Sequence, residues 1–501
     1  MADRHPTLPH ALRDWAAATP DRIALTEGDR ELDYRSLADL VERRAAWMAV
    51  QGVGVGDRVV VLGYNSIGWV VAYLAVLRLG AVAVPVNNRL TPYQVAELVV
   101  LLEPKLVLAD ACHREMLSES RAVPLDLQCE PPVGNSDSAR PLPTGELDAL
   151  ISFTSGTTGK PKGAVLSQAA LYTASATFRT YFATTAEDST LVLAAMFHNT
   201  GFVDQLGQML IAGGRTDLLR EFHRREAIEA FSRRPTSFVT AVPSVLRMLM
   251  LHDEADRVFG PARIALFGGS PMPRAWSQEM LRRWPHICLY HGYGLTEFGS
   301  ACSFLPPELV VEYGESVGYP APEVSLRIAG DVGEDVAAGE VGEIWVSGPS
   351  RMSRYWRRPE ATEEKLSGGW LRTGDLGYLG ERNLLYLVGR RDDVINRGGE
   401  KILPSHLESI LSERVDVGSC VIVGVPDPVL QEVPVAALEP RPGHSFDEPA
   451  ARALMAARLP AYALPQEFFV VPELPRIASG KIDRTGVRAM IIETLERRQA
   501  S

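Results

Sequence analysis

The chain has 501 residues, 46% of them apolar and 23% charged, which is ordinary for a globular protein. A chain of this length is too long to fold around one small hydrophobic core, so two or more domains are predicted. The formal net charge of -11 argues against a general nucleic-acid-binding protein, because phosphate backbones require a basic face. Five cysteines are scattered without a C-x-x-C pair, which predicts reduced thiols and neither a disulfide framework nor a zinc site.

The most apolar stretch runs from Trp69 to Val84, but Arg78 and Gly80 interrupt it and Pro85 follows. This pattern predicts a buried helix leading into a strand, so no membrane span is expected. The N-terminal residues lack an apolar core of signal-peptide length, and the last residues are not a peroxisomal address. We therefore expect a cytoplasmic protein.

The first hundred residues alternate between helical and strand patterns. Leu37, Leu40 and Val41 fall on one face of the earliest helix, and Thr91 is a suitable N-cap for a later one. The alternation predicts a parallel sheet with helices packed on its faces. The expected helices cover residues 34–51, 66–78 and 91–102, and the expected strands cover 58–62, 81–84 and 106–108.

The rest of the chain divides by composition. Residues 118–146 are rich in Pro, Gly, Ser and Asp and predict an exposed connection, after which the alternation resumes at Leu150 and continues past Glu297. Short strands then follow at close spacing, and residues 387–402 concentrate charge and glycine as a hinge does. The elements expected in this region are strands at 324–328, 343–346 and 419–425 and helices at 405–412 and 449–458.

The strongest motif is TSGTTGKPKG at residues 154–163, directly after the apolar run 149–153. Its small residues let the backbone approach a ligand, and its hydroxyls and lysines offer donors to phosphate oxygens. It is not a Walker A loop, because Pro161 follows Lys160 and no Ser or Thr is placed for magnesium. A flexible polar turn is the alternative, but the density of phosphate-suited residues favours a phosphate loop.

This motif resembles the phosphate-loop signature of the adenylate-forming superfamily, which includes acyl-CoA synthetases, firefly luciferases and nonribosomal-peptide adenylation domains. Further segments resemble the other signatures of that superfamily in the same order, and they place the chain in its acyl-CoA synthetase and acyl-AMP ligase branch. These segments are GGSP at 268–271, YGLTE at 293–297, WLRTGD at 370–375, GR at 389–390 and PRIASGK at 475–481.

The resemblance implies an α/β fold. A large N-terminal domain, residues 1–390, would combine sheets layered with helices and a β-rich subdomain. A small mobile α+β domain, residues 391–501, would carry the catalytic lysine. Asp392 falls at the hinge position between them, and Gly399 falls where pantetheine passes.

The resemblance also assigns the nucleotide site. Tyr293 would stack on adenine, Thr296 would meet the α-phosphate, and Asp375 would accept hydrogen bonds from both ribose hydroxyls with support from Arg390. The implied nucleotide-binding set is Thr154, Ser155, Gly156, Thr157, Thr158, Gly159, Lys162, Gly269, Ser270, Tyr293, Gly294, Thr296, Asp375 and Arg390.

The implied catalytic residues are Lys481, Glu297, Thr154 and His198, with Glu297 as the metal ligand for Mg²⁺. A carboxylate must attack the α-phosphorus of ATP, so two anions have to come together. Mg²⁺ on Glu297, the Thr154 hydroxyl and the positive charge of Lys481 would offset their repulsion. No covalent enzyme intermediate is required, and the sequence has no G-x-S-x-G elbow to suggest one.

His198 lies in the segment FHNTG, which resembles the gate at the acyl pocket of this superfamily. The alternative is a core histidine whose ring is satisfied by a backbone carbonyl. The acyl pocket implied by the resemblance consists of His198, Asn199, Gly268 and Gly294.

The predicted function is ATP-dependent activation of a carboxylic acid to an acyl-adenylate, followed by transfer to CoA. ATP and Mg²⁺ are the implied cofactors. The turn from Tyr462 to Gln466 lacks the basic residues that usually meet CoA phosphates, and Arg354 and Gln431 each replace a usual glycine.

Because of that turn, a second function stays open, in which the adenylate passes to a carrier or a separate thioesterifying protein in trans. A luciferase-like oxygenase of the same fold and a non-catalytic acyl-nucleotide sensor also stay open. Lys481 argues against a sensor, since binding alone does not require it.

Overall fold

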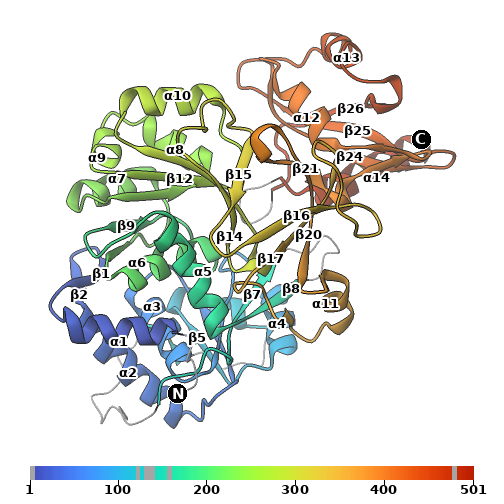
Figure 1. Ribbon diagram of the computed structural model, residues 1–501. Helices are drawn as coiled ribbons and strands as arrows, with labels where there is room; N and C mark the ends of the chain where they lie inside the picture. The colour runs from blue at the N-terminus through green and yellow to red at the C-terminus, as the bar shows by residue number, and fades with distance from the viewer. Residues whose placement is uncertain (1–5, 120–124, 129–140, 155–160, 477–481, 501) are drawn as a thin grey trace. The chain divides into compact units, whose positions relative to one another are not determined.

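The computed structural model describes residues 6–119, 125–128, 141–154, 161–476 and 482–500, with the side chains of 499 and 500 left out. Contacts divide the chain into two compact units (Figure 1). The larger unit comprises Met1–Leu326 with Trp345–Arg372, and the smaller unit comprises Arg327–Ile344 with Thr373–Ser501. Both units mix helices with sheets, which confirms the predicted α/β class. A functional domain boundary at residue 390 stays a prediction.

The first sheet of the larger unit has the strand order β18-β8-β7-β4-β3-β5-β6. Its central strands β4, β3 and β5 are parallel, as the alternating pattern predicted, whereas β7 and β8 form an antiparallel hairpin. Pro85 is the last residue of β4, where its missing N–H interrupts little of the ladder. The strands are β3 (Arg58–Leu62), β4 (Val82–Pro85), β5 (Leu106–Ala109), β6 (Leu125–Asp126), β7 (Asp148–Thr154), β8 (Lys162–Ser167) and β18 (Arg354–Tyr355).

Strand β6 lies inside the segment that composition predicted to be an exposed connection. It pairs in parallel with β5 through Leu108 and Leu125. Two residues are too short for a periodic pattern, so only the tertiary pairing reveals this strand. Residues 120–124 and 129–140 of the same segment lie outside the described residues.

Within the larger unit a second sheet runs in the order β15-β14-β13-β12-β11-β9-β10-β1-β2. Strands β9 to β13 pair in parallel, and β14 and β15 continue the sheet antiparallel. The strands are β1 (Ile23–Glu27), β2 (Arg30–Asp33), β9 (Ser189–Val192), β10 (Arg215–Leu218), β11 (Phe238–Ala241), β12 (Ile264–Gly268), β13 (Cys288–Gly294), β14 (Ala301–Leu305) and β15 (Ser316–Pro320).

Helices fill the space between these two sheets. Helix α3 (Ile67–Arg78) contacts β3 and β4 of the first sheet and β1 of the second, and α5 (Gln168–Tyr181) contacts β7, β8 and β14. The apolar stretch that α3 contains is therefore a buried helix, as predicted. Arg78 is tolerated at its end because Nε lies 2.6 Å from the Glu42 carboxylate.

Caps fix where the predicted helices begin. Ser66 accepts a hydrogen bond from the Trp69 N–H, and Thr91 forms a capping box with Gln94. The other helices of this unit are α1 (Leu8–Ala18), α2 (Tyr34–Val50), α4 (Pro92–Leu102), η1 (Ala111–Leu117), the π-helix η2 (Thr200–Gly207), α6 (Gln208–Ala212), α7 (Arg224–Arg233), α8 (Pro243–Met250), α9 (Asp256–Phe259), α10 (Arg274–Arg283), η3 (Thr296–Phe298) and α11 (Pro359–Lys365).

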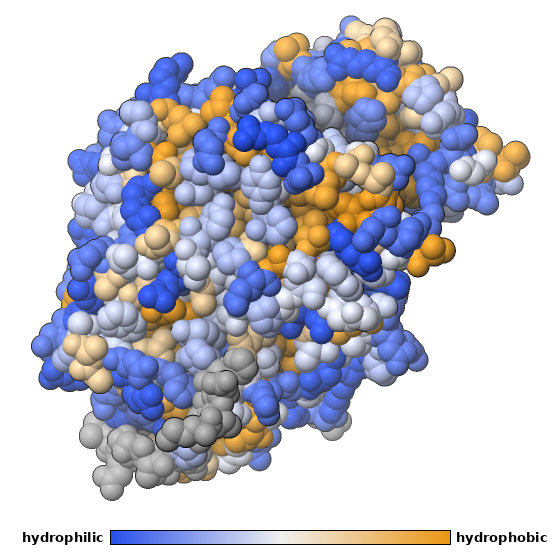
Figure 2. All heavy atoms as spheres, viewed as in Figure 1, coloured by the Kyte–Doolittle hydropathy of each residue, from blue (hydrophilic) through white to orange (hydrophobic). Residues whose placement is uncertain are grey.

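Among the residues that the structure describes, no helix has the length and apolar character needed to cross a bilayer. On the face of the larger unit seen in Figure 2, hydrophilic and hydrophobic residues are interspersed without a continuous apolar band.

Short strands follow β15 in the chain, which confirms the predicted change to closely spaced strands. They are β16 (Ser325–Ala329), β17 (Gly342–Ser347), β19 (Leu366–Ser367), β20 (Trp370–Leu379) and β21 (Leu385–Arg390), and the short helices η4 (Glu381–Asn383) and η5 (Arg391–Asp393) lie among them.

The smaller unit is built around the long hairpin of β24 and β25. Alternate residues of β24 face opposite sides of the sheet: Ile422 packs with α12 and α13, whereas Val421 and Val423 pack with α14. The elements are β22 (Ile395–Arg397), β23 (Glu400–Ile402), α12 (Pro404–Ser412), β24 (Val417–Asp427), β25 (Gln431–Pro440), α13 (Glu448–Ala456), η6 (Ala461–Ala463), β26 (Phe468–Val470) and α14 (Arg484–Ala500). The predicted strand and both predicted helices are confirmed.

Candidate active site

The phosphate-loop motif connects the two strands of the β7–β8 hairpin. Thr154 at the end of β7 is paired with Lys162 at the start of β8, and the Thr154 hydroxyl lies 3.4 Å from the Lys162 carbonyl oxygen. A strand therefore follows the loop, whereas a helix follows a Walker A loop. The predicted phosphate ligands Ser155, Gly156, Thr157, Thr158 and Gly159 lie outside the described residues.

Glu297 lies in η3, and its carboxylate is held by a residue that the sequence did not assign. The Tyr355 hydroxyl donates to Glu297 Oε1 at 2.7 Å, and the Met352 N–H donates to the Glu297 carbonyl at 2.8 Å. Tyr355 is buried in β18, which pairs with β8 next to the loop. Lys162 Nζ lies 5.8 Å from the Tyr355 ring centre. The base of the hairpin thus carries a carboxylate, a hydroxyl and a cation.

Asn199 joins three segments of the larger unit. Its side-chain oxygen accepts from the Ser152 hydroxyl of β7 at 2.9 Å, and its amide donates to the Gly299 carbonyl at 2.5 Å. Both polar ends of the side chain are therefore used within the protein. Asn199 fixes the gate segment against the hairpin and against the turn that follows Glu297.

His198 is exposed, so it is not the satisfied core histidine of the alternative interpretation. That description fits His291, which is buried with Nδ1 2.8 Å from the Ser316 carbonyl oxygen. Burial lowers the pKa of His291 to about 4, so this ring is neutral at physiological pH. The role of His198 as a gate stays a prediction.

The residues predicted to line the adenine and acyl sites follow the ends of two neighbouring strands. Gly268 ends β12 and is paired with Gly292 of β13, which places both strand ends at one edge of the sheet. Gly294 must be glycine, because a Cβ there would lie 2.0 Å from the Ser300 carbonyl oxygen. Tyr293 is buried beside it in β13.

Three further predicted ligands extend from these strands. Gly269 has a φ of +79°, a left-handed conformation that favours glycine, and it turns the chain toward the exposed Ser270. Thr296 is half-buried in η3, directly before Glu297.

The predicted ribose residues are neighbours in the smaller unit. Asp375 of β20 is paired with Arg390 of β21, and Arg390 Nε lies 3.2 Å from Asp375 Oδ1. The Thr373 hydroxyl accepts from the Asp375 N–H at 3.0 Å and donates to the Ile344 carbonyl at 2.7 Å. These two hydrogen bonds connect the segment that carries Asp375 to the neighbouring strand β17.

The predicted hinge residue Asp392 lies in η5. Next to it, burial raises the pKa of the Asp393 carboxyl, and Arg484 Nε lies 3.3 Å from that carboxylate. Arg484 also donates to Glu408 at 2.7 Å. This part of the hinge segment is tied to α12 and α14. Gly399 has a φ of +98° in the turn between β22 and β23, and Lys481, the predicted catalytic lysine, lies outside the described residues.

Two departures from the superfamily pattern have structural counterparts. Arg354 lies with Nη2 2.6 Å from the Asp148 carboxylate at the start of β7. Arg452 of α13 donates to the carbonyls of Pro465 and Gln466, at 2.9 and 2.8 Å. A guanidinium from another element therefore lies at the turn that has no basic residue of its own.

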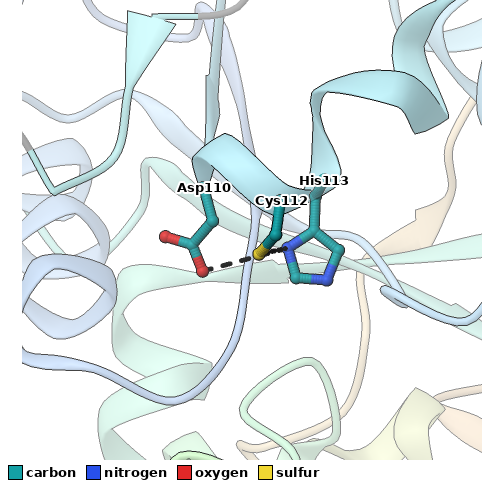
Figure 3. Close-up of side chains that lie close together, drawn as sticks. All are labelled: Asp110, Cys112 and His113. Atoms are coloured by element: carbon teal, nitrogen blue, oxygen red, sulfur yellow. Dashed lines mark hydrogen bonds and ion pairs between the residues drawn. The ribbon is translucent and has the colours of Figure 1, made fainter.

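A separate group of possible metal ligands lies after β5 (Figure 3). His113 Nδ1 is 3.5 Å from Cys112 Sγ and 3.9 Å from Asp110 Oδ2. The Asp110 carboxylate already accepts hydrogen bonds from the Tyr64 N–H and from a side-chain amide. Arg220 Nη2 lies 3.8 Å from the sulfur and would repel a cation. We assign no metal to this group.

Comparisons with known proteins identify the family of this chain. A family model described as AMP-binding enzyme matches residues 12–356, and a model of the AMP-binding enzyme C-terminal domain matches residues 406–481. The chain belongs to the AMP-binding enzyme family.

Curated relatives of this AMP-binding enzyme are CoA ligases. Indoleacetate–CoA ligase of Aromatoleum aromaticum is 33% identical, covering 96% of this chain and 98% of the relative. 2-Succinylbenzoate–CoA ligase of Geobacillus kaustophilus is 32% identical, covering 97% and 99%. Feruloyl-CoA synthase of Amycolatopsis sp is 32% identical, covering 94% and 96%.

Solved structures of a CoA synthetase are also similar to this chain. The o-succinylbenzoate CoA synthetase of Bacillus subtilis with its acyl-adenylate intermediate has a TM-score of 0.86 at 29% identity, covering 95% of this chain and 97% of that chain. The same synthetase with ATP and a magnesium ion has a TM-score of 0.85 at 29% identity, covering 95% and 98%. This chain is thus an ATP-dependent, AMP-forming acyl-CoA ligase. ATP and Mg²⁺ are its cofactors, and CoA is its co-substrate.

Proposed function

We propose that this chain activates an aromatic carboxylic acid and converts the acyl-adenylate into its CoA thioester. The observation that carries the adenylation chemistry is the Glu297 carboxylate, which Tyr355 holds at the base of the phosphate hairpin. The aromatic class is supported by the relatives, whose names specify indoleacetate, 2-succinylbenzoate and ferulate.

An exposed apolar side chain near the predicted pocket supports an apolar acyl body. Val242 follows β11 and is 45% exposed, although valine is usually buried. Its Cγ1 lies 3.7 Å from the position that a Cβ on Gly269 would occupy. A ring of the substrate would shield this side chain from water.

In the first half-reaction the acid carboxylate attacks the α-phosphorus of ATP and displaces pyrophosphate. Glu297 offers a carboxylate oxygen, the ligand type that Mg²⁺ prefers, and Mg²⁺ would supply neutralising charge there. Thr154, Lys162 and Lys481 would donate to the phosphate oxygens, and Asp375 with Arg390 would hold the ribose. Removing one such donor typically slows a reaction about 100- to 1000-fold.

In the second half-reaction the CoA thiolate attacks the acyl carbonyl and releases AMP. We propose that rotation at Asp392 brings the Gly399 turn to the acyl site for this step. Transfer to a carrier protein in trans is the second candidate, since the turn at 462–466 contains no basic residue. We also propose a cytoplasmic site of action, where ATP and CoA are available.

The test separates the two half-reactions. Pyrophosphate release is measured with aromatic, aliphatic and polycyclic acids, and thioester formation is then measured with added CoA. Pyrophosphate with aromatic acids and acyl-CoA as product is the expected result. Accumulation of acyl-AMP in the presence of CoA would favour a carrier, and a clear preference for aliphatic acids would overturn the aromatic class.

A further inference from the structure

A carboxyl group that the proposed mechanism does not use lies next to the predicted acyl pocket. Asp204 belongs to the π-helix η2, which starts directly after His198 and Asn199. Such helices are rare and are frequent at functional sites. Asp204 is only 7% exposed, among the buried apolar residues Phe202 and Val203.

One oxygen of the Asp204 carboxyl is not satisfied by the residues that the structure describes. Within the described part of the chain, Oδ1 is buried and has no hydrogen-bond partner. Burial raises the pKa of Asp204 to about 7, and the Ser300 and Thr200 hydroxyls beside it act against that rise. A buried acceptor without a donor is destabilising, so Oδ1 requires a hydrogen-bond partner that the described part of the protein does not supply.

The neighbours of Asp204 relate it to the acyl site. Ser300 is the residue whose carbonyl oxygen approaches Gly294 so closely that only glycine fits, and the same oxygen accepts from the Leu295 N–H at 2.9 Å. Thr200 directly follows Asn199, which is bonded to Gly299. The carboxyl therefore lies between the two segments that contain the predicted pocket residues.

We infer that Asp204 is a specificity-determining residue of the acyl pocket, where its free oxygen accepts a hydrogen bond from an N–H or O–H group on the body of the substrate acid. This inference rests on the proposed function and narrows it. An apolar pocket with one acceptor rejects an acid that lacks the donor, because the acceptor is then left unpaired. It also rejects an acid with a second carboxylate at that position, since two buried anions repel.

The test uses matched pairs of aromatic acids that differ only in the donor: a phenol against its methyl ether, and an indole N–H against its N-methyl analogue. Acid-dependent pyrophosphate release gives kcat/KM for each. The wild-type enzyme should prefer the donor-bearing acid at least ~10-fold. Asp204→Leu should reduce that ratio to within about 3-fold, and Asp204→Asn should improve activity with a dicarboxylic analogue because the repulsion is gone.

Asp217→Asn is the matched control. Asp217, on β10, is also a buried carboxyl with a raised pKa, but it accepts hydrogen bonds from the Thr26 hydroxyl and from Arg215. This control should leave the donor preference unchanged, even where it lowers the thermal midpoint.

The outcomes separate the two proposals. Donor ratios that are equal in the wild type, or that neither Asp204 variant changes, overturn the inference while leaving the proposed function intact. The absence of pyrophosphate release with every acid tested would instead overturn the proposed function. If Asp204→Leu does not fold, the dicarboxylate result with Asp204→Asn decides.

Discussion

At the scale of single residues, the Glu297 carboxylate depends on a partner far away in the sequence. Tyr355 is separated from Glu297 by 58 positions, yet its hydroxyl donates to Oε1. A hydrogen bond of this kind fixes the direction of a carboxylate that binds a cation, and the loss of such a partner typically costs about 10- to 100-fold in affinity or activity.

We therefore expect Tyr355→Phe to lower the rate of pyrophosphate release about 10- to 100-fold and to raise the Mg²⁺ concentration needed for half-maximal rate. Tyr93→Phe is the control, because Tyr93 also donates to a glutamate, Glu97, but on the exposed face of α4. It should change neither quantity. A Tyr355→Phe enzyme with wild-type Mg²⁺ dependence would contradict this role.

Asn199 is a second residue whose structural role could not be predicted from the residues near it in the sequence. The resemblance placed it in the acyl pocket, and the structure adds two hydrogen bonds that join β7 to the turn at Gly299. We expect Asn199→Ala to destabilise the protein by about 1–3 kcal/mol, because Gly299 loses its donor in a buried site. Thermal unfolding and the KM for the acid measure this. Unchanged values for both would show that the bridge does not position the pocket.

At the scale of secondary-structure elements, one carboxylate ties the starts of three parallel strands. Asp188, before β9, accepts from Arg263 Nε and from the Ser237 hydroxyl, both at 2.7 Å, and these residues precede β12 and β11. Burial acts to raise the pKa of Asp188, but Arg263, the Thr185 N–H and Ser237 outweigh it and hold the pKa below its usual value.

This lowered pKa predicts an acid-dependent stability. The contribution of Asp188 should be present above the unfolded pKa, near 4, and should disappear as the pH falls through the folded pKa. Asp188→Asn should therefore reduce the free energy of unfolding by about 2–4 kcal/mol at neutral pH and by less in acid. Urea unfolding at several pH values measures this. Asp39→Asn, in an exposed pair with Arg43, should have little effect at any pH.

The β24–β25 hairpin contains a strained residue. Gln431 begins β25 with a φ of +68°, a left-handed conformation that is unfavourable for residues with a Cβ. We expect Gln431→Gly to raise the stability by up to about 1 kcal/mol, and Gln431→Ala to bring no such gain. Urea unfolding compares the two variants. Equal stabilities would show that the strain is negligible.

The helices and central strands could be predicted because their signals are local. The periodicity of α2, the capping residues Ser66 and Thr91 and the apolar run of β3 all lie within a few neighbouring residues. Two elements have no local signal of their own type: β6 has only two residues, and no short pattern in residues 200–207 distinguishes the π-helix η2 from an α-helix. Only pairing with β5 or packing among other elements defines these.

At the scale of the whole molecule, the enzyme consists of two units that each contain part of the predicted site. The larger unit holds Glu297 and the base of the phosphate hairpin, and the smaller unit holds Asp375 with Arg390. Because both half-reactions are proposed to use both units, the segment around Asp392 should control them.

We expect Asp392→Pro to slow thioester formation at least ~10-fold, and more than it slows adenylation. Proline fixes its own φ near −65° and drives the preceding residue, Arg391, away from helical geometry, which restricts rotation there. Single-turnover measurements of pyrophosphate release and of acyl-CoA formation test this. Asp392→Ala, which removes only the side chain, should affect both less. If both half-reactions were unchanged in Asp392→Pro, domain rotation would not be the mechanism.

The sequence by itself determined the α/β class, many of the helices and strands, and the adenylate-forming signatures, since these depend on short contiguous patterns. The resemblance of those signatures to the superfamily then implied the reaction. Only the tertiary structure revealed that Tyr355 holds Glu297, that Asn199 bridges β7 and Gly299, and that Asp204 has a free buried oxygen. Each of these depends on atoms brought together from distant parts of the chain. Burial and hydrogen bonding decide what such a residue does, and neither can be read from the letters beside it.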